Sequence, residues 1–338
     1  MTGDEHLGKI DASTFEDVIA GNLGADRDDV TLGPTAGVDF GVFAVGGEAV
    51  VTATDPLSFL PELGHERAGR LALDIVLTDV AVSGVAPTHV TICLTLPPDF
   101  DDGTFEGIWT GIDAHARNLG VSIVSGHTAY YPGIDTSWVG AATAIGVGDP
   151  AGVVRPDGAR PGDALVISTG PAAEVAGLFA TLYPEELELP AETVATARER
   201  VDDIAAVEDA LAAHDAGAVT AMHDATEGGI VGGLAEMAAG AGVRIDLETA
   251  SVPVADGVLD VCDAAGVDPW RVTSCGTLLI AVDPEDARPV VDALRARGTP
   301  AAVAGTVGEG EGLYVDGERT DQPAVDESWA ASDRLAGE

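Results

Sequence analysis

The chain has 338 residues, of which 57 are acidic and 16 basic, so its formal net charge is −41 at pH 7. Because 46% of the residues are still hydrophobic, the composition indicates an ordinary buried core rather than a disordered chain, and the length indicates two domains. The acid excess argues against a nucleic-acid partner, and it is typical of a salt-rich cytoplasm such as that of an extreme halophile, where molar salt shortens the Debye length to about 3 Å.

The chain start and the cysteines suggest a reduced, cytoplasmic protein. No basic stretch followed by an apolar one opens the sequence, and no apolar run approaches the length of a membrane span. We therefore expect no membrane partner. Cys93, Cys262 and Cys275 lie far apart, which argues against a disulfide framework or a zinc site. Cys275 could be a nucleophile, but with no base visible beside it we interpret all three as buried structural thiols.

Residues 1–150 are expected to form an α/β domain with about four strands. Two β-rich runs, 39–45 and 48–54, flank a Gly-Gly pair and predict a hairpin. Apolar residues at helical spacing cover 66–83 and a second helix is expected at 104–119. Further strands are expected at 89–96, 121–124 and 138–146, and the second of these three runs leads into Ser125-Gly-His-Thr128 before a loop.

A stretch rich in Pro, Gly, Asp and Arg at 148–163 marks the predicted domain boundary. The second domain, 160–320, is also expected to be α/β and to open with a strand at 164–168. Its other strands are expected at 243–247, 277–282 and 301–307, and its helices at 172–182, 193–214, 232–239, 257–265 and 285–297. Residues 321–338 are polar and acidic, and they are expected to form a loosely held tail.

Three aspartates stand where predicted elements turn: Asp39, Asp55 and Asp79. Hard carboxylates that converge on one point suit Mg²⁺ bridged to phosphates. The alternative is that each is a turn or cap residue on an acidic chain, and spacing alone leaves both interpretations open.

Two glycine-containing motifs could approach an anion. Ser125-Gly-His-Thr128 follows a strand, so its backbone could reach a phosphate and His127 could act as a donor or base. His223-Asp-Ala-Thr-Glu-Gly-Gly229 stands between a short strand and a helix, which suits an anion at the helix start, although a plain helix cap by Asp224 or Thr226 explains it equally well. Lys9, the sole lysine, could fold over phosphates or simply face solvent.

Taken in order, five motifs resemble those of the PurM-like (AIR synthase-related) superfamily over about residues 30–315. Their sequences are most similar to those of its HypE group of hydrogenase-maturation proteins. The motifs are Gly37-Val-Asp-Phe-Gly-Val-Phe43, Thr54-Asp-Pro56, Thr78-Asp-Val-Ala-Val-Ser-Gly-Val-Ala-Pro87, Ser125-Gly-His-Thr128 and Asp224-Ala-Thr-Glu-Gly-Gly229. The resemblance implies an N-terminal α/β domain that forms a β-barrel across a homodimer, a C-terminal α+β domain, and ATP in a cleft between them.

The site residues follow from the motifs and the resemblance together. The implied Mg²⁺ ligands are Asp39, Asp55, Asp79 and Asp224. The implied nucleotide contacts are Lys9, Asp39, Asp79, Gly126, Thr128, Asp224, Gly228 and Gly229. His127 and His223 are the candidate catalytic residues.

The implied activity is Mg-ATP-dependent phosphorylation or dehydration of an oxygen-bearing substrate, either a small molecule or a modified peptide. Thr78, Val38 and Glu227 depart from the usual motif residues, and His127 stands where some relatives carry an acid. The printed sequence ends in Gly-Glu rather than in the terminal Cys of HypE, so self-modification at such a thiol is not expected. Two alternatives stay open: a thiamine-monophosphate kinase-like phosphotransferase and a non-catalytic, nucleotide-binding dimeric scaffold.

Overall fold

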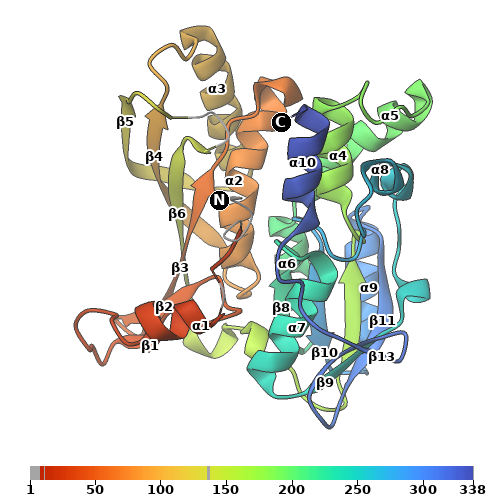
Figure 1. Cartoon of the computed structure of the whole chain (residues 1–338). Helices are drawn as coiled ribbons and strands as arrows, with labels where there is room; N and C mark the ends of the chain where they lie inside the picture. Colours follow the sequence, from red (N-terminus) through yellow and green to blue (C-terminus); the bar gives the residue numbers. More distant parts are fainter. Residues whose placement is uncertain (1–7, 11, 135–137, 338) are drawn as a thin grey trace.

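The computed structural model describes residues 8–10, 12–134 and 138–337, which form two α/β domains side by side (Figure 1). The N-terminal domain holds a six-stranded sheet in the order β1-β2-β3-β6-β4-β5. All its pairs are antiparallel except β4 with β5. The strands are β1 (Val30–Leu32), β2 (Gly41–Val45), β3 (Glu48–Leu57), β4 (Pro87–Leu96), β5 (Ser122–Tyr130) and β6 (Gly140–Gly148).

Helices cover one face of this sheet. α2 (His65–Ala81) and α3 (Asp102–Asn118) pack against each other, and α2 lies on β3 and β6. The opposite face and the edge strand β5 are uncovered, with Val124 and Val147 about half exposed. The sheet is open, so the barrel implied by the resemblance is not closed within one chain. A short helix α1 (Ala12–Thr14) and a π-helical turn (Phe15–Ala20) precede β1.

The C-terminal domain holds a seven-stranded sheet in the order β13-β12-β9-β11-β7-β10-β8, in which only β12 and β9 are parallel. Alternate residues of β7 point into two different cores, since Val166 joins one and Ile167 the other. Both faces of this sheet are therefore buried. The strands are β7 (Ala164–Ser168), β8 (Val219–Asp224), β9 (Arg244–Leu247), β10 (Leu278–Val282), β11 (Ala301–Gly308), β12 (Gly312–Val315) and β13 (Glu318–Thr320).

Seven helices belong to this second half of the chain as described. They are α4 (Ala173–Leu182), α5 (Ala191–Arg198), α6 (Val207–Ala216), α7 (Gly229–Ala241), α8 (Val258–Ala265), α9 (Ala287–Ala296) and α10 (Glu327–Ala336). α7 packs against β12 and β9 on one side of the sheet, and α9 packs against β11 and β7. α4 contacts α5 and α8 in a separate small core.

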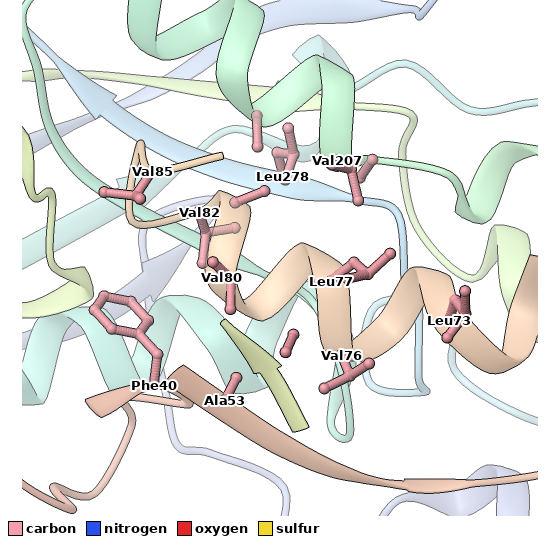
Figure 2. Close-up of a cluster of buried hydrophobic side chains, with 14 of the residues drawn as sticks. Phe40, Ala53, Leu73, Val76, Leu77, Val80, Val82, Val85, Val207 and Leu278 are labelled. Atoms are coloured by element: carbon pink, nitrogen blue, oxygen red, sulfur yellow. The ribbon is translucent and has the colours of Figure 1, made fainter. Parts of the chain in front are cut away.

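The two domains share one hydrophobic core, and α2 lies between them. Leu77 and Val80 of α2 belong to the same buried cluster as Val207 of α6 and Leu278 of β10 (Figure 2). Since this core crosses the boundary, the last turn of α2 is held by both domains.

The structure differs from the expected elements in three places. The helix expected at 193–214 is instead α5 and α6 with a 3₁₀ turn (Glu199–Ile204) between them. This turn packs so closely on α4 that a Cβ on Gly177 would lie 2.5 Å from the Val201 amide nitrogen. The strand expected to end at Val124 runs on as β5 to Tyr130, so Ser125–Thr128 lies within the strand and does not follow it. The hairpin of β12 and β13 was not expected, although its Asp316-Gly317 turn, with both φ positive, is a sequence signal for one.

The terminal segment is not the loosely held tail that its composition suggests. Residues 327–336 form α10, in which Ser328 and Ala331 are buried. Tyr183 and Ser332 hydrogen-bond through their hydroxyls at 2.8 Å, and the Trp138 and Trp329 rings lie 5.8 Å apart. Packing of one face of α10 against the rest of the domain therefore orders a segment whose acidic composition predicts a loosely held tail.

Within the described ranges, no helix is both long enough and apolar enough to cross a bilayer.

A carboxylate-lined cavity between the domains

The aspartates singled out in the sequence come together from four separate elements. Asp39 precedes β2, Asp55 lies near the end of β3, Asp79 is in the last turn of α2, and Asp224 ends β8. The first three line one cavity of about 310 Å³, whose walls come from both domains. Asp224 is buried directly behind it, and one oxygen each of Asp39 and Asp224 and a His223 nitrogen lie within 4.8 Å of one another. The predicted convergence is therefore present.

Burial and mutual repulsion disfavour full ionisation of this group. Burial is the main cause that raises the pKa of Asp79 well above its usual range, and the charges of Asp224, Asp55 and Asp39 add to it. Burial, and then the charges of Asp39 and Asp224, raise the pKa of Asp55 to about 7. Carboxylates held in this way are stabilised by a cation.

Lys9 supplies one cation at the cavity. Its Nζ lies 3.2 Å from Asp39 Oδ1 and 3.2 Å from Thr226 Oγ1. Burial opposes ionisation of Asp39, but the charges of Lys9 and His223 outweigh it and lower the pKa of Asp39. Lys9 itself is partly desolvated, yet Asp39 and Glu236 hold its pKa above the usual value.

His223 lies beneath the cavity and does not line it. Its Nε2 is 3.0 Å from Glu236 Oε2, and its Nδ1 is 3.7 Å from Asp39 and 3.5 Å from Asp224. Burial alone would lower the pKa of His223, but the nearby Asp224 carboxylate, the hydrogen bond to Glu236 and the charge of Asp39 raise it to about 10. In this arrangement His223 is a buried imidazolium that neutralises carboxylates, and its predicted catalytic role is not supported by a position at the cavity.

The donor set fits a hard divalent cation. Asp39 Oδ2 and both carboxylate oxygens of Asp224 are buried and receive no hydrogen bond from any described residue. Buried carboxylate oxygens without donors are costly unless a metal or another cation satisfies them, and oxygen ligands are those that Mg²⁺ prefers.

The first residues of α7 do not have the cap or the amide partner that the sequence predicts. Gly228 is the N-cap residue and has a positive φ, so neither Asp224 nor Thr226 caps the helix. The amide of Gly228 donates to Asp326 Oδ2 at 2.8 Å, and Asp326 begins α10. Gly229 also has a positive φ, and a Cβ there would lie 2.4 Å from the Val272 carbonyl oxygen. The two glycines thus serve a tight turn, and a carboxylate from the chain itself takes the Gly228 position predicted for phosphate.

Gly126, His127 and Thr128 do not line the cavity. They lie on edge strand β5, where all three are exposed. Asp55 pairs with Ala142, Ala142 with Ile92, and Ile92 with Gly126, so two strands separate Asp55 from Gly126. At about 4.8 Å per strand the separation is about 14 Å. Their predicted nucleotide contacts and the catalytic role of His127 are thus not served within one chain.

Several residues of the cavity were not found from the sequence. Beyond the aspartates the wall becomes largely apolar, with Leu178 and Phe179 of α4 and Trp329 of α10. Glu174 and Cys275 line the same cavity. Cys275 and Cys262 are buried as expected, whereas Cys93 is exposed, and the position of Cys275 at the cavity was not foreseen. No local motif marks these positions, since α4 and α10 meet only in the folded chain.

The fold and this cavity define an enzyme of two α/β domains with a carboxylate centre at their junction. Two family models match the chain: AIR synthase related protein, N-terminal domain, over residues 37–147, and AIR synthase related protein, C-terminal domain, over 160–318. The chain belongs to the AIR synthase-related family.

Individual relatives agree. The carbamoyl dehydratase HypE of Rhizobium leguminosarum bv. viciae is 30% identical over 83% of this chain and 79% of its own length. The crystal structure of Escherichia coli HypE superimposes with a TM-score of 0.66 at 26% identity, covering 81% of this chain and 86% of that one. A structure of the hydrogenase maturation protein HypE in complex with ATP shares the fold, with a TM-score of 0.64 at 24% identity and coverage of 88% and 83%.

Proposed function

We propose that this protein is a HypE-like enzyme that binds Mg-ATP in the interdomain cavity and transfers a phosphoryl group to an oxygen of an acceptor substrate. The observation that carries the proposal is that Asp39, Asp55 and Asp79 line one cavity with Asp224 buried behind it, and that carboxylate oxygens of Asp39 and Asp224 are buried without hydrogen-bond donors. The similarity to HypE, of which one structure contains ATP, supports the nucleotide.

Asp39, Asp55, Asp79 and Asp224 would hold the magnesium ion, which when bound neutralises charge on the transferring phosphoryl group. Lys9 adds a point charge at the cavity and would meet phosphate oxygens once the ion takes over Asp39. The positive charge of the buried His223 partly neutralises the carboxylates of Glu236 and Asp39, with which it forms ion pairs. Because Asp79, Asp55 and Asp224 are held by α2, β3 and β8, the orientation of these three side chains is set before any ligand enters.

We also propose a homodimer formed through the open face and edge of the N-terminal sheet. The edge strand β5 has free ladder positions, and Val124, Tyr130 and Val147 are each about half exposed there or nearby. A second copy that paired there would cover these side chains. It would also place residues of the second chain beside Gly126–Thr128, which are exposed in a single chain. Light scattering in molar KCl should give twice the 34.1 kDa chain mass; a monomer at micromolar concentration would contradict this part of the proposal.

The binding step is tested by calorimetry with Mg·AMP-PCP in molar KCl. Asp79→Ala removes a proposed magnesium ligand from the centre, and we expect binding to fall at least 100-fold, since contacts of a carboxylate with a cation are worth about 3 kcal/mol. Asp28→Asn removes one charge at an exposed loop and should leave binding unchanged. Equal affinity of the wild type and Asp79→Ala would refute the assignment of the cavity, as would binding that does not need magnesium.

A further inference from the structure

A second cavity, which we call the α2–α3 cavity, lies across α2 from the carboxylate centre. Its volume is about 290 Å³, and its lining has no described residue in common with that of the first cavity. α2 contributes Glu66, Arg70 and Asp74 to it, and Leu71, Ala72, Ile75 and Asp79 to the first. Arg70 and Ile75, in the middle of these two sets, are five positions apart, which is about 140° around a helix. A ligand in the α2–α3 cavity would therefore leave the proposed magnesium and nucleotide site free.

The walls of the α2–α3 cavity come from both domains. α2 and α3 form two of them and approach each other so closely that a Cβ on Gly69 would lie 2.5 Å from the Ile108 carbonyl oxygen. The third wall belongs to the C-terminal domain, where Ala205 and Val207 lie at the start of α6. An occupant would thus contact both domains, and it would stabilise the folded chain because unfolding destroys the cavity.

A buried ion pair forms the floor of this cavity. Asp74 is 2% exposed and His115 is 8% exposed, and the distance from His115 Nε2 to Asp74 Oδ1 is 2.6 Å. Both residues line the cavity. The contact engages only Oδ1, and Oδ2 receives no hydrogen bond from the described residues. A buried carboxylate oxygen in this position favours a ligand that brings a hydrogen-bond donor.

The positive charge in the lining is already paired. Arg70 donates to Asp202 at 3.3 Å, and the carboxylate of Glu208 at the rim accepts a hydrogen bond from Arg297 at 3.0 Å. The exposed Glu66, also at the rim, has no partner among the described residues. The groups left to meet a ligand are therefore mainly acceptors with negative charge, which favour a cation and disfavour an anion.

The arrangement suits an organic cation better than a metal ion. Within the described ranges, three acidic, histidine or cysteine ligand atoms come within 4.8 Å of one another only at Asp39, His223 and Asp224. The α2–α3 cavity therefore lacks a compact ligand cage. Its acceptors are spread around a space large enough for several non-hydrogen atoms, and part of its wall is apolar.

We propose that the α2–α3 cavity binds a small organic cation that has a primary ammonium group and a short alkyl body. An ammonium group has three N–H donors, and Asp74, Glu66 and Asn118 each offer an acceptor oxygen in the lining. Leu119 and Val207 line the same cavity and would contact the alkyl chain. The inference does not depend on the function proposed for the first cavity.

The experiment compares three probes of similar size by ligand-observed NMR in molar KCl. At neutral pH n-butylamine is a cation, 1-butanol is an uncharged donor, and butyrate is an anion. We expect millimolar binding of n-butylamine, with at least fivefold weaker binding of 1-butanol and at least tenfold weaker binding of butyrate. n-Butylamine should also raise the melting temperature, and the rise should grow with its concentration. Absence of n-butylamine binding, or equal binding of butyrate, overturns the inference.

Two pairs of variants separate this site from general attraction to an acidic surface. Glu66→Gln should weaken n-butylamine at least threefold, whereas Glu62→Gln, an equal change of charge at an exposed position outside the cavity, should not. Ala114→Leu fills part of the cavity and should weaken n-butylamine at least tenfold, whereas Thr110→Leu, one turn earlier on α3 and outside the lining, should not. All four positions are exposed, so the variants should unfold like the wild type. If both members of either pair have the same effect, the cation binds elsewhere and the inference is wrong.

Discussion

Replacing Asp55 by Asn should stabilise the protein without its ligands. The folded state raises the pKa of this carboxyl from 3.8 to about 7 through burial and the neighbouring Asp39 and Asp224. The folded form therefore keeps its proton to higher pH than the unfolded form does. The resulting penalty is absent below about pH 4, grows as pH rises from about 4 to 7, and is constant above that range.

The size of the penalty follows from the difference between the two pKa values. About three pH units correspond to about 4 kcal/mol at pH 8, which is an upper limit because solvent and salt enter the cavity. We expect Asp55→Asn to raise the free energy of unfolding by about 1–4 kcal/mol at pH 8 and by much less at pH 4.5. Mg·AMP-PCP should stabilise the variant less than the wild type, since one proposed ligand is lost.

Denaturant unfolding followed by circular dichroism at both pH values, in molar KCl, measures this difference. Asp28→Asn carries the same change of charge on an exposed loop and should shift neither value by more than about 0.5 kcal/mol. If Asp55→Asn is no more stable than the wild type at pH 8, or if its gain is the same at pH 4.5, carboxylate repulsion does not govern the stability of the site.

Three further outcomes are expected. Asp326→Ala removes both the cap of α10 and the partner of the first α7 amide, so it should cost about 1–3 kcal/mol in denaturant unfolding, whereas Asp333→Ala on the exposed side of α10 should cost under about 0.5. Gly229→Ala places a Cβ 2.4 Å from the Val272 carbonyl oxygen at a positive φ, so its melting temperature should drop clearly, while Gly152→Ala, with nothing within 4 Å, should melt like the wild type. Raising KCl from 0.1 to 2 M should raise the melting temperature, because it screens the repulsion of a −41 chain, and an unchanged melting curve would contradict that explanation.

The sequence predicted elements more reliably than it predicted contacts between them. The helix around residues 66–83 and the strands of both sheets other than β1, β12 and β13 follow from the sequence pattern, and α2 carries Asp79 at the end where the motif places it. The meeting of Asp79 with Asp224 depends on a core shared by two domains, which only the motif resemblance anticipated. Local pattern contains no information on such distant pairing.

The errors share a physical cause as well. The sequence predicts that the strand ends at Val124, before the polar Ser125–Thr128, but pairing with β4 keeps the chain extended as far as Tyr130. The acidic composition of residues 321–338 concealed one apolar face, which packs as α10 and supplies Asp326 to the start of α7. In both segments tertiary contacts outweighed local preference.

The arrangement of α2 explains how a repulsive site can persist in the folded chain. Asp79 is held in the same helical turn as Leu77 and Val80, which are fully buried in the core that joins the domains (Figure 2). Burial of each such side chain stabilises by about 1.5–3 kcal/mol, so two of them offset a carboxylate penalty of the size worked out for Asp55. The helix cannot move away from the other aspartates without exposing this core. The carboxylates therefore stay close together before a cation binds. When the cation binds, it relieves the electrostatic repulsion between them.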